Sequence, residues 1–260
     1  MRNPFSGITL KDFIPPIIEK IMLKVENQLN VKLKSGPRGL FQYVPAGLDI
    51  RWMLDLGAAD GAITRAALDS FPDCKVVCFE PVSATFEQLK SNLARYGGRV
   101  VFYNLAVGDY SGKAEINITS SKYANSLKIK SELYSQTNPQ IKEIGKEEIT
   151  VVSLDSMLDK MPVVDFDLVK IDVEGFEQQV LRGGNIFFRN HVDTVIIEVS
   201  LARDDSWEHQ SYLDIFSILN EYGFRLVNVY DVENSTRSRT SKNLMLSQMD
   251  CVFRHISKLK

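Results

Sequence analysis

Short apolar runs alternate with amphipathic segments along most of the chain from Arg51 onward. The runs with the length and content of buried strands are 52–56, 75–79, 99–105, 166–171, 194–199, 224–231 and 250–254. Between them, apolar residues at helical spacing predict helices around 63–67, 86–93 and 216–219. Strands that are apolar on both faces and separated by helices are typical of a parallel sheet covered on both sides. The pattern predicts an α/β fold with a doubly wound sheet, occupying residues 49–260.

The N-terminal segment, residues 1–48, has a different pattern. Apolar side chains recur at helical spacing over 17–25, after a break at Pro15-Pro16. We interpret the segment as a helical extension that packs on the domain's own core or on a partner subunit, which would make the protein a homo-oligomer. Docking on a membrane surface is the alternative, but Asp12, Glu19 and Glu26 interrupt the basic face.

Residues 111–153 form an insert within the domain. Two strand-like pieces, 114–118 and 148–152, enclose a long polar segment. Insertions of this length are usually functional caps or loops. We expect the choice of substrate to depend on 119–147, on the N-terminal helices and on the 200–210 loop. The basic loop 234–243 is a candidate contact for an acidic substrate, or else a solvated loop.

Composition narrows the function classes. The 260 residues include 31 Lys and Arg against 33 Asp and Glu, a net charge of −2, which disfavours a nucleic-acid partner. Three cysteines do not make a disulfide framework. No apolar run approaches the ~20 residues that span a bilayer, so we expect no integral membrane segment. With no signal-peptide core at the N-terminus, the predicted location is cytoplasmic.

A glycine-rich turn follows the first predicted strand. Its sequence is Asp55-Leu56-Gly57-Ala58-Ala59-Asp60-Gly61, and such a turn lies where ligands bind in this type of sheet. The glycines allow a ligand to approach the backbone closely. The spacing is not the G-x-G-x-x-G of dinucleotide-binding proteins. Asp55 and Asp60 would repel a pyrophosphate but attract a sulfonium or ammonium group.

Two further strand ends complete a nucleoside site. Glu80 ends the second strand, where a carboxylate can accept hydrogen bonds from both ribose hydroxyls. The third strand ends in Asn104-Leu105-Ala106, next to the expected position of an adenine.

The fourth predicted strand carries charges that are costly in an apolar strand unless they are paired or used. Lys170 and Asp172 alternate onto one face, and Asp172 and Glu174 emerge at the edge that carries Asp55 and Glu80. A purely structural ion pair of Lys170 is one interpretation, and a functional site is the other. A Mg²⁺ ion held by Asp172 and Glu198 is left open, and no metal is assigned.

These segments together resemble the FkbM-type family of S-adenosylmethionine-dependent methyltransferases. The resemblance rests on residues 53–68 (MLDLGAADGAITRAAL), 76–93 (VVCFEPVSATFEQLKSNL), 104–116 (NLAVGDYSGKAEI), 125–127 (NSL), 149–158 (ITVVSLDSML), 167–184 (DLVKIDVEGFEQQVLRGG) and 195–200 (VIIEVS). It implies a Rossmann-like seven-stranded sheet whose last strand is antiparallel. It also implies S-adenosyl-L-methionine as cofactor and O-methylation of a sugar, glycan or related natural product.

The resemblance assigns roles to individual residues. Those expected to face the methionine part of the cofactor are Asp55, Gly57, Ala58 and Gly61, and Asp60 of the same turn is assigned to cofactor binding. Glu80 would hold the ribose, and Asn104 and Ala106 would flank the adenine. A substrate hydroxyl needs a base to remove its proton. Asp172 and Glu174 are the candidates, with Lys170 orienting or tuning them.

Two other functions remain open at this point. One is an NAD(P)-dependent oxidoreductase or epimerase, which the missing G-x-G-x-x-G and the acidic turn disfavour. The other is a non-catalytic member of the methyltransferase fold, which the intact acids disfavour. A nucleic-acid methyltransferase is disfavoured because the charge is balanced and no basic-aromatic patch is present.

Overall fold

The computed structural model describes residues 49–121, 123, 125–127, 140–200, 212–234 and 246–259, without the side chains of 200, 230–234 and 246–248. All of them belong to one compact unit, Gly36–Lys260. The predicted N-terminal helices, most of the 200–210 loop and nearly all of the 234–243 loop lie outside the described residues.

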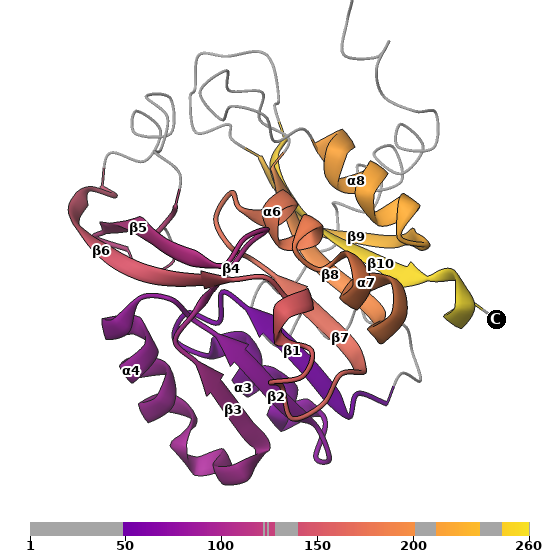
Figure 1. Ribbon diagram of the computed structural model, residues 1–260, viewed down its shortest axis with the longest axis horizontal. Helices are drawn as coiled ribbons and strands as arrows, with labels where there is room; N and C mark the ends of the chain where they lie inside the picture. The colour runs from indigo at the N-terminus through magenta and orange to yellow at the C-terminus, as the bar shows by residue number, and fades with distance from the viewer. Residues whose placement is uncertain are drawn as a thin grey trace, which may run out of the picture. The chain divides into compact units, whose positions relative to one another are not determined.

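Seven strands form the main sheet in the order β3-β2-β1-β7-β8-β10-β9 (Figure 1). They are β3 (Val100–Tyr103), β2 (Lys75–Phe79), β1 (Trp52–Leu56), β7 (Phe166–Ile171), β8 (Val192–Ser200), β10 (Leu246–His255) and β9 (Phe224–Asn234). The pairs from β3 to β8 are parallel, whereas β10 runs antiparallel to both β8 and β9. The predicted doubly wound α/β sheet with an antiparallel last strand is confirmed.

Helices cover both faces of this sheet. Within the described ranges the α-helices are α3 (Ala62–Ser70), α4 (Ser83–Leu93), α6 (Glu177–Arg182), α7 (Asn185–His191) and α8 (Tyr212–Glu221), with 3₁₀ turns η2 (Ala94–Arg99), η3 (Asp155–Met157) and η4 (Ile256–Lys258). Alternate residues of β1 point to opposite faces. Met53 packs in a cluster with Ala67 and Leu89 of α3 and α4. Leu54 belongs to the cluster that contains Val180 of α6 and residues of α7 and α8. Burial on both faces explains the continuous apolar runs of the sequence.

Two strands of the insert and one short strand just before it form a second, three-stranded sheet in the order β4-β6-β5. Its strands are β4 (Ala106–Val107), β5 (Gly112–Thr119) and β6 (Glu143–Val152), which confirms the strands expected at 114–118 and 148–152. Glu147 of β6 accepts hydrogen bonds from Ser83 N at 3.0 Å and Ser83 Oγ at 2.6 Å. This contact fixes the second sheet to the first turn of α4.

All three cysteines of the chain lie in its described part. Cys74, Cys78 and Cys251 are free and buried. Within the described ranges, no helix combines the length and the apolar character needed to cross a membrane.

Candidate active site

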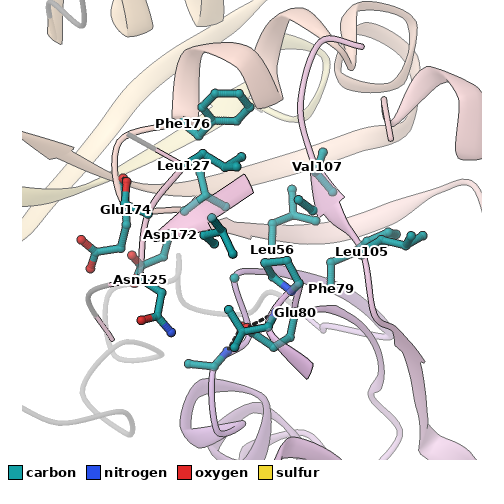
Figure 2. A pocket seen from close by; sticks show the side chains of 18 of the residues that line it. Leu56, Phe79, Glu80, Leu105, Val107, Asn125, Leu127, Asp172, Glu174 and Phe176 are labelled. Carbon is teal, nitrogen blue, oxygen red and sulfur yellow. Dashed lines mark hydrogen bonds between the residues drawn. The ribbon is translucent and has the colours of Figure 1, made fainter. Parts of the chain in front are cut away.

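A cavity of about 260 Å³ lies at the carboxyl ends of β1, β2, β7 and β8 (Figure 2). The residues that line it from these strand ends include Gly57, Glu80, Asp172 and Glu198. The second sheet and the insert add Ala106, Val107, Ile116, Tyr123, Asn125, Ser126 and Leu127. Ligands of open α/β sheets bind outside the carboxyl ends of the strands. This cavity is therefore the candidate active site.

The loop after β1 takes a conformation that depends on glycine. Gly57 has φ +80°, and a Cβ there would stand 1.9 Å from the carbonyl oxygen of Asp172. The next turn places Ala59 at φ 46°, a left-handed conformation that is strained for a side chain of this type. The Ala59 N–H donates to Glu80 Oε2 at 3.1 Å. The loop is thus fixed between the ends of β2 and β7.

Asp55 lies behind this loop rather than in the cavity wall. Its side chain is buried and accepts a hydrogen bond from Thr64 Oγ1 of α3 at 2.5 Å. Burial raises the pKa of Asp55 to about 6, although the Thr64 hydrogen bond and the charge of Lys170 oppose the rise. Asp55 therefore ties β1 to the start of α3, below the Gly57–Gly61 turn.

Glu80 is held by backbone groups on both carboxylate oxygens. Oε2 accepts from Ala59 N, and Oε1 accepts from Val82 N at 3.0 Å. Burial raises the pKa of Glu80 to about 7, while these two hydrogen bonds lower it. Asn104 does not line the cavity; its Nδ2 donates to the carbonyl oxygens of Glu80 and Pro81, both at 2.9 Å. Asn104 thereby fixes the turn that presents Glu80.

Four charged side chains gather where β7, β8 and β10 meet. Lys170 has a side chain only 4% exposed, with Nζ 3.0 Å from Asp172 Oδ2 and 3.9 Å from Asp250 Oδ1. Glu198 of β8 pairs in register with Asp250 and shares a hydrogen bond with Asp172. Asp172 and Glu198 line the cavity, and Lys170 lies beneath them. The ion pair expected for Lys170 is present at the edge of the site.

The charged groups in this cluster shift one another's pKa values. Burial alone would lower the pKa of Lys170, but Asp172, Asp250 and Glu198 outweigh it and raise that pKa. Burial and the Asp172 charge raise the pKa of Glu198 well above its ordinary value. For Asp172, burial is opposed by the charge and hydrogen bond of Lys170, and the net pKa is lowered. Asp172 is therefore ionised at neutral pH, with its side chain 37% exposed.

The segment after β7 turns sharply to bring Glu174 to the cavity. Glu174 has φ 50° and Gly175 has φ 95°, both left-handed. The buried Glu177 supports the turn by accepting from Gly175 N at 3.0 Å. From the insert, Ser126 Oγ donates to the Glu174 carbonyl oxygen at 2.7 Å. The insert is thus joined to the loop that carries the predicted catalytic acids.

The structure divides the predicted site residues into two groups. Those that line the cavity are Gly57, Glu80, Ala106, Asp172 and Glu174. Those that lie behind it or at its border are Asp55, Ala58, Asp60, Gly61, Asn104 and Lys170. Cavity-lining residues that the sequence analysis did not assign include Tyr123, Asn125 and Ser126. All three lie in the 119–147 segment that was expected to decide substrate choice, and Asn125 and Ser126 also belong to the Asn-Ser-Leu piece of the family resemblance.

Asp172 and Glu198 are the two residues for which a Mg²⁺ ion was left open. Both line the cavity, as their strand-end positions suggested. Across the described part of the chain, no three His, Cys, Asp or Glu side chains are grouped so that they could hold a metal ion.

Comparison with known proteins decides the family. A model of the methyltransferase FkbM domain matches residues 55–226, which include the end of β1, all of β2, β7 and β8, and every predicted site residue. The chain belongs to the methyltransferase FkbM domain family. A solved relative, methyltransferase FkbM from Methylobacillus flagellatus KT, has the same fold with a TM-score of 0.54 and 15% identity. That match covers 86% of this chain and 49% of the other.

Two curated proteins are similar to this FkbM-domain chain over 60% of its length. Methyltransferase 1 of Beauveria bassiana is 24% identical over 168 residues, which make up 68% of that protein. Hexuronic acid methyltransferase AglP of Haloferax volcanii is 29% identical over 156 residues. This chain spans 58% of the length of the Haloferax protein and about half of the Methylobacillus structure.

Proposed function

We propose that the protein is an S-adenosylmethionine-dependent methyltransferase that methylates a hydroxyl group on a sugar, glycan or related natural product. The observation that carries the proposal is the cavity at the strand ends of an FkbM-domain chain, with a backbone-anchored Glu80 at one side and Asp172 at the other. The similarity to a hexuronic acid methyltransferase supports a sugar as acceptor.

The residues present fit this cofactor. Glu80 offers a carboxylate oriented by two backbone N–H groups, which suits the ribose hydroxyls. Apolar side chains of Phe79, Val82 and Leu105 line the neighbouring wall, as an adenine requires. Asp172 and Glu174 also line the cavity, where their carboxylates would favour a cationic sulfonium. When bound, S-adenosylmethionine supplies a methyl group activated by its positive sulfur.

The chain's own residues would position the acceptor and remove its proton. Asp172 is ionised and held by Lys170, so it can accept a hydrogen bond from the acceptor hydroxyl and orient it. Glu174, presented by a strained turn that the insert supports, is the second candidate base. Lys170 is a positioning residue, because it acts through Asp172 and lies beneath the cavity.

Binding measurements separate this proposal from its alternatives. We expect S-adenosylhomocysteine to bind in isothermal titration and NAD not to bind. Tight binding of NAD alone would favour an oxidoreductase instead. A transfer assay with a tritiated methyl donor over a panel of glycans and hydroxyl-bearing natural products would then identify the acceptor. Binding without transfer to any hydroxyl would favour a non-catalytic member of the fold.

Two broader predictions accompany this proposal. Three free, buried cysteines are consistent with a reducing compartment, so the cytoplasm remains the predicted location. Oligomerisation through the N-terminal helices remains a prediction as well, because those helices lie outside the described residues. Balanced charge continues to disfavour a nucleic-acid acceptor.

A further inference from the structure

Asn125 of the insert presents an unused hydrogen-bond donor to the cavity. The backbone N–H of Thr119 lies 2.8 Å from Asn125 Oδ1. A backbone N–H can only donate, so this contact fixes which end of the carboxamide is oxygen. The Nδ2 group is therefore the end that points away from Thr119. Among the described residues it has no hydrogen-bond partner, and Asn125 lines the cavity (Figure 2).

The backbone around Asn125 is held firmly enough to aim this donor. Ser126, 1% exposed, exchanges backbone hydrogen bonds with Asn117 of β5 at 3.0 and 3.3 Å. Its hydroxyl also holds the Glu174 carbonyl. On the other side, Tyr123 Oη donates to Asp60 Oδ2 at 3.1 Å. Tyr123 and Ser126 thus connect the loop after β1 with the loop after β7.

The order of the strands indicates which part of the cofactor lies there. Along the edge of the sheet, β3 is followed by β2, β1 and β7. If the ribose lies at Glu80 on β2 and the adenine next to β3, the amino-acid end of the cofactor lies toward β1 and β7. The neighbours of Asn125 in the chain, Tyr123 and Ser126, contact the loops that follow these two strands.

The charges at that end create a specific need. Asp172 and Glu174 suit an ammonium or sulfonium group, but they repel a carboxylate. The amino-acid part of S-adenosylmethionine carries both an ammonium and a carboxylate. A neutral N–H donor at this end can hold the carboxylate through a charge-assisted hydrogen bond.

We propose that Asn125 donates a hydrogen bond from Nδ2 to the carboxylate of the cofactor's amino-acid part. This inference rests on the proposed function. It assigns to the insert a share of cofactor binding, in addition to any contact with the acceptor.

The test compares two ligands on three variants by isothermal titration. S-adenosylhomocysteine carries the amino-acid part, and 5′-methylthioadenosine lacks it. Asn125→Asp keeps the oxygen that Thr119 needs but replaces the donor with a carboxylate oxygen, and Asn125→Ala removes both. Asn190→Ala, at an exposed position on α7, is the matched control.

We expect Asn125→Asp and Asn125→Ala to weaken S-adenosylhomocysteine binding by about tenfold or more, since a hydrogen bond to a charged group is lost. Binding of 5′-methylthioadenosine is expected to change by less than about twofold, and Asn190→Ala to leave both ligands unchanged.

Other outcomes overturn the inference in distinguishable ways. Asn125→Ala could weaken the binding of both ligands equally while Asn125→Asp binds both as tightly as the unaltered protein. That result would mean that Asn125 only supports the insert. Unchanged binding of both ligands in both variants would mean that Asn125 does not touch the cofactor. An unaltered protein that binds neither ligand would refute the proposed function itself.

Discussion

Gly57 and Asp172 are so close that a Cβ on Gly57 would stand 1.9 Å from the Asp172 carbonyl oxygen. The contact joins the loops after β1 and β7, the two strands at the centre of the candidate site. Because the obstacle is backbone and Gly57 also has φ +80°, no side-chain movement can relieve it.

We therefore expect Gly57→Ala to lower the free energy of unfolding by more than about 2 kcal/mol and to weaken S-adenosylhomocysteine binding. Chemical denaturation and isothermal titration measure the two effects. Gly145→Ala is the control, because a Cβ on Gly145 in β6 would meet nothing within 4 Å. Normal stability and binding in Gly57→Ala would show that the two loops separate at little cost.

Lys170 compensates the carboxylates of Asp172, Glu198 and Asp250 from a buried position. Lys170→Met removes this buried cation, and we expect a loss of about 3 kcal/mol of unfolding free energy at pH 8. The loss is expected to be smaller at pH 5, where the carboxyl groups take up protons more readily. Urea unfolding at both pH values tests this.

Lys113→Met is the control for Lys170. Its ion pair with Glu148 is exposed on both sides, so we expect a change below about 1 kcal/mol. A Lys170→Met protein as stable as this control would mean that the buried carboxylates tolerate one another without the cation.

The fold was predictable because it depends on repeated patterns. The apolar runs of β1, β2 and β7 reflect burial on both faces, and their carboxyl ends must meet at one edge. Gly57, Glu80 and Asp172 were therefore expected together, and the structure brings them together. Each of these three residues is the first residue after the end of its strand.

The division of roles within the site was less predictable. Asn104 stands at a strand end like Glu80, yet its amide clamps the Glu80 turn. Asp55 stands next to the glycine turn, yet its carboxylate accepts a hydrogen bond from Thr64, which lies behind the turn. Ser126 reaches Glu174 across 48 residues of sequence. These roles depend on the direction of each side chain and on contacts between residues far apart in the sequence. The periodicity of apolar residues in strands carries no information on either.

Two buried acids make stability depend on pH. The pKa of Asp55 is raised to about 6 and that of Glu80 to about 7, in both cases chiefly by burial. The folded protein then binds more protons than the unfolded chain between about pH 4 and pH 7, so stability falls as the pH rises through this window. For Glu80 alone the full effect is on the order of 3 kcal/mol.

Denaturation of the ligand-free protein between pH 5 and pH 8 measures this dependence. Glu80→Gln is expected to flatten it, whereas Glu87→Gln, on the exposed side of α4, is expected to leave it unchanged. Stability that rises over this range would contradict the raised pKa values of these carboxyl groups.

Glu174 differs from Glu80 in that its predicted role concerns the acceptor and not the cofactor. Its backbone is held by Ser126 whatever side chain it carries, so Glu174→Gln is expected to preserve the loop. We expect binding of S-adenosylhomocysteine to change by less than about threefold. Turnover on the hydroxyl acceptor found in the transfer assay should fall by at least about tenfold, because an amide cannot take the proton.

Glu143→Gln, at an exposed position on β6, serves as the comparison for Glu174→Gln. If Glu174→Gln keeps full turnover, Glu174 is not the base, and Asp172 remains as the residue that receives the proton. A loss of cofactor binding in the same variant would instead place Glu174 against the ammonium of the cofactor. The split between binding and turnover therefore decides which of the two acids faces the acceptor.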